Sequence, residues 1–253
     1  MEIKRIIPIL TILNDDLVKT KFFNQTNLTY IGDILNAVRI FNDKNAEEII
    51  INDIGATVNN KKPNFSLIKK ISSISRMPIS YGGGIKSLED AKKILSYGIE
   101  KISISSALFE NDNILEEFVS EIGSQSVSVT IDLKMINDDY FIFTNNGKTH
   151  KKVILNEFIK KISKFAGELV INSIDNDGNM NGPDERMISN IYKELKIPLV
   201  VTGGFGKIDD IINICNKYDI IGVACGSLFV YKGNNNAVLI NYPIDEIRRK
   251  LDI

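Results

Sequence analysis

The sequence has few of the residues that build disulfide frameworks or metal sites. Its 253 residues include two cysteines, Cys215 and Cys225, and a single histidine, His150. Two cysteines are too few for a disulfide framework, and no Cys/His cluster has the spacing of metal ligands, so we expect no metal and no cofactor. The same scarcity excludes Cys-His machinery for hydrolysing glutamine, and the chain has no P-loop. We expect His150, in a polar segment, to lie at the surface.

The chain also lacks an excess of charge and any long apolar run. Its 31 basic and 32 acidic residues give a net charge of −1, so there is no electrostatic signature of nucleic-acid or membrane binding. No stretch approaches the length of a membrane span. The apolar segment from Ile6 to Leu13 contains Pro8 and has no small-residue cleavage site, which favours a strand over a signal peptide. We expect a cytoplasmic protein with small-molecule ligands.

Short runs rich in β-branched residues alternate with amphipathic stretches along the whole chain. This alternation is typical of repeated βα units around a parallel sheet, and the length suits one α/β barrel. We predict a single (β/α)8 TIM barrel over residues 1–253. Strands are expected at Ile6 to Ile12, Glu48 to Ile54, Pro78 to Tyr81, Lys101 to Ser105, Ser126 to Leu133, Glu168 to Ile174, Pro198 to Thr202 and Ile220 to Cys225. Helical patterns occur at Ile34 to Asn42, Ser87 to Tyr97, Asn113 to Glu121, Leu155 to Phe165, Asp184 to Leu195 and Ile208 to Lys217.

An internal repeat divides the predicted barrel into two halves. Shifting the chain by 120 residues aligns Ala46 to Asn52 with Ala166 to Asn172. The same shift aligns further pairs: Pro78 with Pro198, Gly83-Gly84 with Gly203-Gly204, and Leu108-Phe109 with Leu228-Phe229. One shared offset for four segments is hard to obtain by chance. We therefore expect duplicated (βα)4 units, about residues 1–122 and 123–253, with equivalent sites on opposite sides of the barrel.

Two connections are longer than barrel closure requires. Residues Asn14 to Gly32 follow the first strand, and Lys134 to Lys152 follow the fifth. In the second, the alternating segment Tyr140 to Thr144 precedes Asn145 to Gly147, which predicts a small hairpin. Both connections follow strand carboxyl ends, where the loops of such barrels usually serve the active site.

Two glycine turns lie between a strand and a helix, Gly82 to Ile85 and Gly203 to Gly206. Small residues follow one unit later, at Ser105 to Ala107 and at Cys225 to Ser227. Backbone N–H groups can approach an anion closely at such places, so two opposed phosphate cradles are predicted. The alternative is that these are only tight βα turns.

Acidic residues at strand ends are the candidates for proton transfer and substrate binding. Asp132 ends the fifth strand, and alternation points its side chain away from that of Lys134, which disfavours a salt bridge between them. Asp53 ends the second strand, while Asp175 and Asp177 follow the sixth, where they could also form a turn that satisfies its own backbone. Lys19, in the first long connection, could bind an anion or be a solvated lysine.

Four further charged residues lie near strand starts: Arg5, Glu48, Lys101 and Glu168. Charges on buried strands need partners, and these two positive and two negative side chains balance. They predict either salt bridges on the bottom surface or an inward ring at the base of the barrel.

Together these residues resemble the cyclase subunit of imidazole glycerol phosphate synthase, over essentially the whole chain. The matching segments are Lys4 to Pro8, Val18-Lys19, Asp53-Ile54, Gly82 to Ile85, Lys101 to Ile104, Gly123 to Gln125, Ile131-Asp132, Ser173 to Gly178 and Gly203-Gly204. The resemblance implies a glutaminase docked at the amino-terminal face and an ammonia gate formed by Arg5, Glu48, Lys101 and Glu168. It assigns phosphate binding to Gly84, Ser105, Ser106, Gly178, Gly204, Gly226 and Ser227. It makes Asp132 one of two catalytic aspartates.

The second aspartate of that family is absent. At its position, the end of the first strand, this chain has Thr11. A threonine hydroxyl is no acid or base near neutral pH, and losing one such group typically lowers the rate about 10² to 10⁴-fold. A divergent branch of the family also lacks this aspartate, and its ending is similar to residues 226–243. Its members accompany a glutaminase and an ATP-using amidotransferase in adding acetamidino groups to surface sugars.

Three hypotheses follow. The chain is a conduit subunit that passes ammonia upward and binds a phosphorylated or nucleotide sugar, which is the interpretation the resemblance favours. Alternatively it is a working cyclase-lyase of histidine biosynthesis that uses Asp132 and Asp177. The third hypothesis is a scaffolding barrel that retains phosphate sites without turnover.

Overall fold

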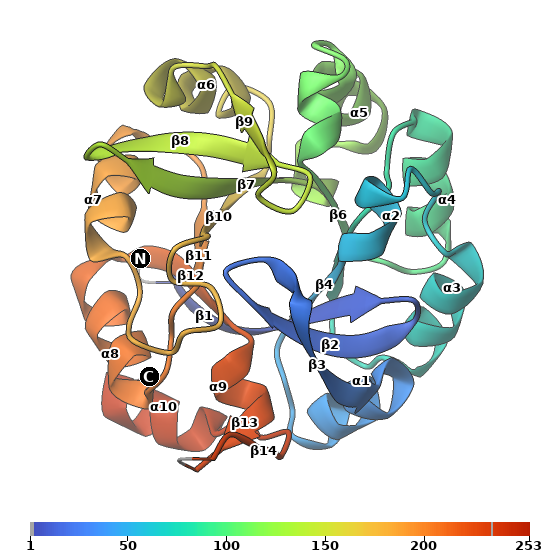
Figure 1. Ribbon diagram of the computed structural model, residues 1–253. Coiled ribbons are helices and arrows are strands. Elements are labelled where there is room, and N and C mark those ends of the chain that lie inside the picture. The colour runs from blue at the N-terminus through green and yellow to red at the C-terminus, as the bar shows by residue number, and fades with distance from the viewer. Residues whose placement is uncertain (1–2, 234) are drawn as a thin grey trace.

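Eight parallel strands close into a barrel in the computed structural model, which describes residues 3–233 and 235–253 (Figure 1). In barrel order these strands are β1 (Ile3–Leu13), β4 (Ile49–Asp53), β5 (Ile79–Gly82), β6 (Lys101–Ile104), β7 (Val127–Ile136), β10 (Glu168–Ser173), β11 (Leu199–Thr202) and β12 (Ile220–Cys225). Pairing of β7 with β10 and of β12 with β1 closes the ring. The predicted (β/α)8 TIM barrel is confirmed.

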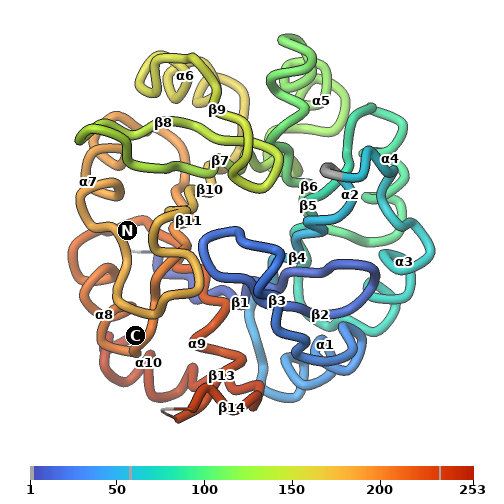
Figure 2. Tube along the Cα trace, in the orientation of Figure 1, coloured from blue at the N-terminus to red at the C-terminus, as the bar shows by residue number. Residues whose placement is uncertain are grey.

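Helices surround the barrel (Figures 1 and 2). They are α1 (Ile34–Asp43), α3 (Phe65–Ile74), α4 (Leu88–Ser96), α5 (Ile114–Ile122), α6 (Leu155–Ile162), α7 (Glu185–Glu194), α8 (Ile208–Lys217) and α10 (Ile244–Leu251). Side chains of Asp33, Asn64 and Asp184 cap α1, α3 and α7 by accepting N–H groups of the first turn. The helical patterns did not include α3 and α10. None of the helices within the described residues is long and apolar enough to cross a membrane.

The apolar core has two layers, because successive side chains of a strand point to opposite faces. Ile6 and Leu10 of β1 belong to the large cluster between the strands and the helices. Ile7 and Ile9 belong instead to a smaller cluster with Ile50, Val170, Val200 and Ala224, which lies inside the barrel. Burial on both faces explains why the strands are nearly continuous apolar runs.

The two long connections fold as antiparallel hairpins at the carboxyl ends of the strands (Figures 1 and 2). The first contains β2 (Asp16–Lys21) and β3 (Asn24–Asp33), so what the sequence presented as a loop is a ribbon paired with β1. The second contains the end of β7, β8 (Asp139–Thr144) and β9 (Thr149–Lys151), which confirms the predicted small hairpin.

Short elements complete the chain. They are α2 (Ile54–Val58), the 3-10 turns η1 (Ser106–Phe109) and η2 (Ser124–Ser126), α9 (Ser227–Val230), β13 (Tyr231–Lys232) and β14 (Ala237–Val238). Two of them, η1 and α9, follow the ends of β6 and β12 directly and begin at the small residues that the sequence singled out.

Candidate active site at the carboxyl ends of the strands

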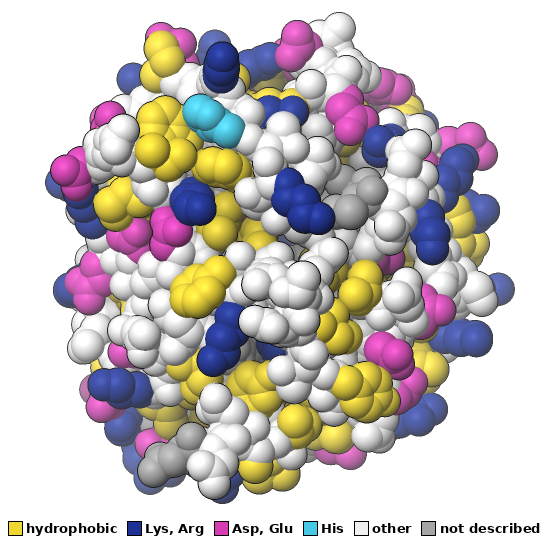
Figure 3. Space-filling view, viewed as in Figure 1, with side chains coloured by type: hydrophobic (Ala, Val, Ile, Leu, Met, Phe, Trp, Pro, Cys, Tyr) yellow, Lys and Arg dark blue, Asp and Glu magenta, His cyan; other side chains and the backbone are white. Residues whose placement is uncertain are grey.

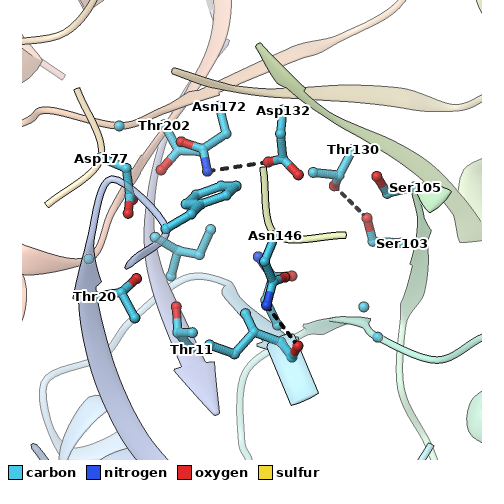
Figure 4. A pocket seen from close by; sticks show the side chains of 18 of the residues that line it. Thr11, Thr20, Ser103, Ser105, Thr130, Asp132, Asn146, Asn172, Asp177 and Thr202 are labelled. Atoms are coloured by element: carbon cyan, nitrogen blue, oxygen red, sulfur yellow. Dashed lines mark hydrogen bonds between the residues drawn. The ribbon is translucent and has the colours of Figure 1, made fainter. Parts of the chain in front are cut away.

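A pocket opens at the carboxyl ends of the barrel strands, between the two hairpins (Figure 4). Parallel strands bring their last residues to one face, which is why residues far apart in sequence meet there. The pocket contains most of the predicted site residues: Thr11, Lys19, Asp53, Gly84, Ser105, Ser106, Asp132, Asp177, Gly178, Gly204, Gly226 and Ser227. Asp175, another predicted site residue, is not among the described residues that line the pocket. Its exposed carboxylate accepts a hydrogen bond from the backbone N–H of Met135 at 2.9 Å.

The two glycine turns have backbone conformations that favour glycine. The φ angles are 71° at Gly84 and 90° at Gly204. A Cβ atom on Gly84 would lie 2.7 Å from the carbonyl oxygen of Lys61, and one on Gly204 would collide with that of Gly182. Tight packing therefore accounts for glycine at both turns, and phosphate binding there stays a prediction.

Two carboxyl groups in the pocket have strongly raised pKa values. Burial, reinforced by the charge of Asp177, raises the pKa of Asp132 to about 7, while a hydrogen bond from Asn172 acts in the opposite direction. Burial also raises the pKa of Asp177 to about 6, against the lowering effect of the Lys19 charge. Groups that titrate near neutral pH are suited to proton transfer.

Lys19 is buried, so the alternative that it is a solvated surface lysine does not hold. Its side chain reaches from β2 into the pocket, where Nζ lies 3.5 Å from the carbonyl oxygen of Ile9 and beside Gly226. Burial lowers the pKa of the Lys19 amine, while Asp177 acts against this effect. An amine held in this way is placed to meet an anionic group of a ligand.

Asp53 has a local structural role as well as a place in the pocket. Its carboxylate accepts the backbone N–H groups of Gly55 and Ala56, both at 3.0 Å, and so caps the start of α2. Burial raises the pKa of Asp53. Asp177 is likewise tied to its surroundings, because its carbonyl accepts the N–H of Phe22 at the tip of the β2–β3 hairpin, at 3.0 Å.

At the opposite end of the barrel, four charged side chains form a closed ring of ion pairs. Arg5 binds Glu48 at 2.8 Å and also contacts Glu168. The Nζ atom of Lys101 lies 3.5 Å from a carboxylate oxygen of each glutamate. Each positive group touches both negative groups, so charge alternates around the ring. The Glu168 side chain is only 5% exposed.

The chain matches the family model described as "Histidine biosynthesis protein" over residues 5–236. It belongs to this family. A protein of Leptospira borgpetersenii, provisionally named imidazole glycerol phosphate synthase subunit HisF, is 47% identical over 242 residues, 94% of each chain. A provisionally named hisF2 subunit of Pseudomonas aeruginosa is 40% identical over 95% of this chain and 96% of its own length. The imidazole glycerol phosphate synthase subunit HisF of Sulfolobus acidocaldarius is 37% identical over 87% of this chain and 88% of its own.

Thr11 is a notable feature of this histidine biosynthesis family member. It lies at the end of β1 in register with Asn52 of β4, and both line the pocket. Asp132 lies across the pocket in Figure 4, in register with Asn172 of β10. The wall formed by β7 therefore carries the titratable carboxyl group of Asp132, whereas the wall formed by β1 carries the hydroxyl group of Thr11.

Several polar pocket residues were missed by the sequence analysis: Asn52, Ser103, Thr130, Asn146, Asn172 and Thr202. Most are strand residues whose side chains face inward at the level of Asp132. The only sign of these residues in the sequence is that most of them lie at or near the end of an apolar run. That position indicates a pocket residue only when the register of the barrel strands is known. Asn146, from the β8–β9 turn, extends across the mouth and donates to the carbonyl of Ile54 at 3.1 Å (Figure 4).

His150 lies on β9, outside the pocket, as expected for a surface residue. It is exposed and is the cyan side chain in Figure 3. Its ring stacks on Phe143, with centroids 5.4 Å apart, and meets the edge of Phe141 at 5.0 Å. In the described part of the chain, no group of three or more His, Cys, Asp or Glu side chains is arranged to hold a metal ion.

Proposed function

We propose that this chain is the cyclase-like barrel subunit of a glutamine amidotransferase complex. Ammonia from a glutaminase enters at the base of the barrel and supports amidation of a phosphorylated or nucleotide-linked sugar. The observation that carries the proposal is the closed ring of Arg5, Glu48, Lys101 and Glu168, combined with Thr11 in the pocket. Ion pairs withdrawn from water are costly compared with apolar packing, so their presence at the base favours a role beyond stability.

In this proposal the four ring residues form the ammonia gate. The glutaminase docks at the amino-terminal face, where the strands begin. Between the ring and the pocket lie the apolar side chains of Ile7, Ile50 and Val200, with the buried Ser80 in register with Ile50. The ammonia that leaves at the pocket end of the barrel is used by an ATP-using sugar amidotransferase. A separate ATP-using partner is needed because this chain has no P-loop.

The ligand sites of the proposal lie in the pocket. Phosphate or pyrophosphate oxygens bind at the two turns and at the small residues beside them: Gly84, Ser105, Ser106, Gly178, Gly204, Gly226 and Ser227. Lys19 and Asp53 contact the substrate, and Asp132 and Asp177 move protons. A role for Asp175 requires a ligand or a partner that extends beyond the pocket, because this residue lies outside it.

A second candidate function is that of a genuine cyclase subunit in histidine biosynthesis. The observation that favours it is the pair Asp132 and Asp177, which share one pocket and have pKa values of about 7 and about 6. The relative from Sulfolobus acidocaldarius is named imidazole glycerol phosphate synthase subunit HisF. Thr11 weighs against it, because cyclisation with two opposed acid/base groups loses one of them. In a scaffolding barrel, the third candidate, neither carboxyl group would matter.

The experiment that tests the proposal compares two nitrogen sources in a complex reconstituted with the cognate glutaminase. Replacing Lys101 or Glu48 with alanine should lower glutamine-dependent product formation while ammonia-dependent formation persists. Glu47→Ala, which removes a neighbouring surface pair with Arg248, is the matched control and should change neither. Equal losses with both nitrogen sources would mean that the ring is structural. Turnover of the cyclase substrate by the purified chain with ammonia would favour the second candidate.

A further inference from the structure

Two asparagines occupy matching places in the two halves of the barrel. Asn52 on β4 and Asn172 on β10 are 120 residues apart in the chain, the offset of the internal repeat. Asn52 is in register with Thr11 on one neighbouring strand, and Asn172 is in register with Asp132. In-register residues of adjacent parallel strands place their side chains side by side on the same face. Each asparagine therefore lies beside the residue that distinguishes its half.

A glycine lies against the oxygen of each amide: Gly82 at the end of β5, and Gly203 one residue beyond the end of β11. A Cβ atom on Gly82 would lie 3.1 Å from Oδ1 of Asn52, and one on Gly203 would lie 2.9 Å from Oδ1 of Asn172. Both distances are too short for a comfortable contact, so each amide oxygen occupies the space that a missing side chain leaves. The NH₂ group of Asn172 points toward Asp132 on the opposite strand, and the matching place of Asn52 directs its NH₂ group toward the strand that carries Thr11.

Asn172 uses this direction to hold Asp132. Its Nδ2 donates to Oδ1 of the carboxylate at 3.4 Å, as the dashed line in Figure 4 shows. Its own Oδ1 is buried and has no hydrogen-bond partner among the described atoms. An amide that leaves its oxygen unpaired to keep this donor contact is an unfavourable arrangement for stability alone. The arrangement is understandable if the orientation of the carboxylate matters.

We propose that Asn172 is a positioning residue that orients the Asp132 carboxylate for proton transfer, and that Asn52 is the same device in the half whose carboxylate is absent. The proposal rests on the proposed function only in giving Asp132 a proton to move. The other groups that act on this site electrostatically are Asp177, whose charge acts on Asp132, and Lys19, whose charge acts on Asp177. Asn172 differs from both because it is neutral, so its effect comes through one directed hydrogen bond.

The two halves supply a matched experiment. Asn172→Leu removes the donor and keeps an isosteric side chain, whereas Asn172→Thr keeps a donor on a residue suited to a strand. Asn52→Leu makes the same change in the other half, beside Thr11. Titration of ¹³C-labelled aspartate carboxyl groups by NMR reads out each variant, and Asp132→Asn identifies the signal of interest. Repeating the series with Asp177→Asn removes the coupled carboxyl group.

Loss of the donor should lower the proton dissociation constant of Asp132 about threefold or more, because a hydrogen bond to the charged form favours that form. Asn172→Thr should restore much of the original value, and Asn52→Leu should leave it unchanged. If Asn172→Leu does not fold, Asn172→Ala gives the same comparison. Equal titration in all variants, or the same change from Asn52→Leu, would overturn the proposal. No substrate is present in this measurement, so its outcome is independent of whether the chain supports amidation.

Discussion

The Nζ atom of Lys19 occupies the space that Gly226 leaves free. A Cβ atom on residue 226 would collide with Nζ, and it would also lie 3.2 Å from the carbonyl oxygen of Ile9. The backbone itself does not require glycine, because φ is −101° at this position. The buried amine therefore explains the glycine, and the two residues act as one unit at the start of α9.

Gly226→Ala should expel the Lys19 amine from its place in the pocket. Because a hydrogen bond to a charged group contributes about 1.5–3 kcal/mol, affinity for an anion at this site should fall about tenfold or more. Calorimetric titration with inorganic phosphate measures the effect. Lys19→Met is the partner variant, and the double variant should be little worse than either single one. Additive losses would show that the two residues bind the anion independently.

Stability should decrease as the pH rises from about 4 to about 7. The pKa values of Asp132 and Asp177 are raised in the folded protein, to about 7 and about 6, so folding favours their protonated forms. This contribution is complete below the ordinary carboxyl pKa and is lost as the pH passes the folded values. We expect a change of about 3–6 kcal/mol in the free energy of unfolding.

Urea denaturation across this pH range provides the measurement, and the variants Asp132→Asn and Asp177→Asn should flatten the profile. Glu121→Gln is the control, because the pKa of this exposed group is lowered by its hydrogen bond from Lys92 and its charge contributes little. A profile that stays steep in both asparagine variants would place the titrating groups elsewhere.

Much of the fold followed from the sequence because its strands are buried on both faces. Each of the eight β-branched runs became a barrel strand, and the Asn145 to Gly147 turn marked its hairpin with typical turn residues. The β2–β3 hairpin was missed for the opposite reason. Its tip is Phe22-Phe23, two aromatic residues with φ angles of 53° and 58°, where composition alone favours no turn.

Only part of the candidate site could be predicted from the sequence, for a different physical reason. Glycines and isolated charges stand out in a sequence, so the pocket turns and the four ring residues could be singled out. Asn52 and Asn172 follow apolar runs in the same way as many strand-end residues do. Whether they face the pocket beside Thr11 or Asp132 depends on the neighbouring strand and on the register between the two strands. The register of a closed barrel cannot be predicted from a local sequence pattern.

Removing one member of the ring at the base should be far more costly than removing a surface charge nearby. Glu168 accepts from both Arg5 and Lys101 and is almost fully buried, so Glu168→Ala leaves two cations with a single partner. We expect a loss of about 3 kcal/mol in the free energy of unfolding. Glu47→Ala removes the exposed pair with Arg248 and should cost less than about 1 kcal/mol. Similar losses measured by urea denaturation would show that the ring is effectively solvated.

Replacing Thr11 with aspartate should restore part of a two-carboxylate site. The new side chain would lie at the end of β1 beside the Asn52 amide, in the relation that Asp132 has to Asn172. The wild-type chain should be a poor cyclase with ammonia, since one acid/base group is worth about 10² to 10⁴ in rate. Thr11→Asp should then raise the ammonia-dependent turnover of the cyclase substrate, which is measured by product absorbance, and Thr11→Asn should not.

Adding Asn52→Leu to Thr11→Asp should remove part of the gain, because the new carboxylate loses its donor. Normal turnover by the wild-type chain would contradict the sugar-amidation proposal, whereas silence in Thr11→Asp would mean that the pocket differs from a cyclase site at more than one residue.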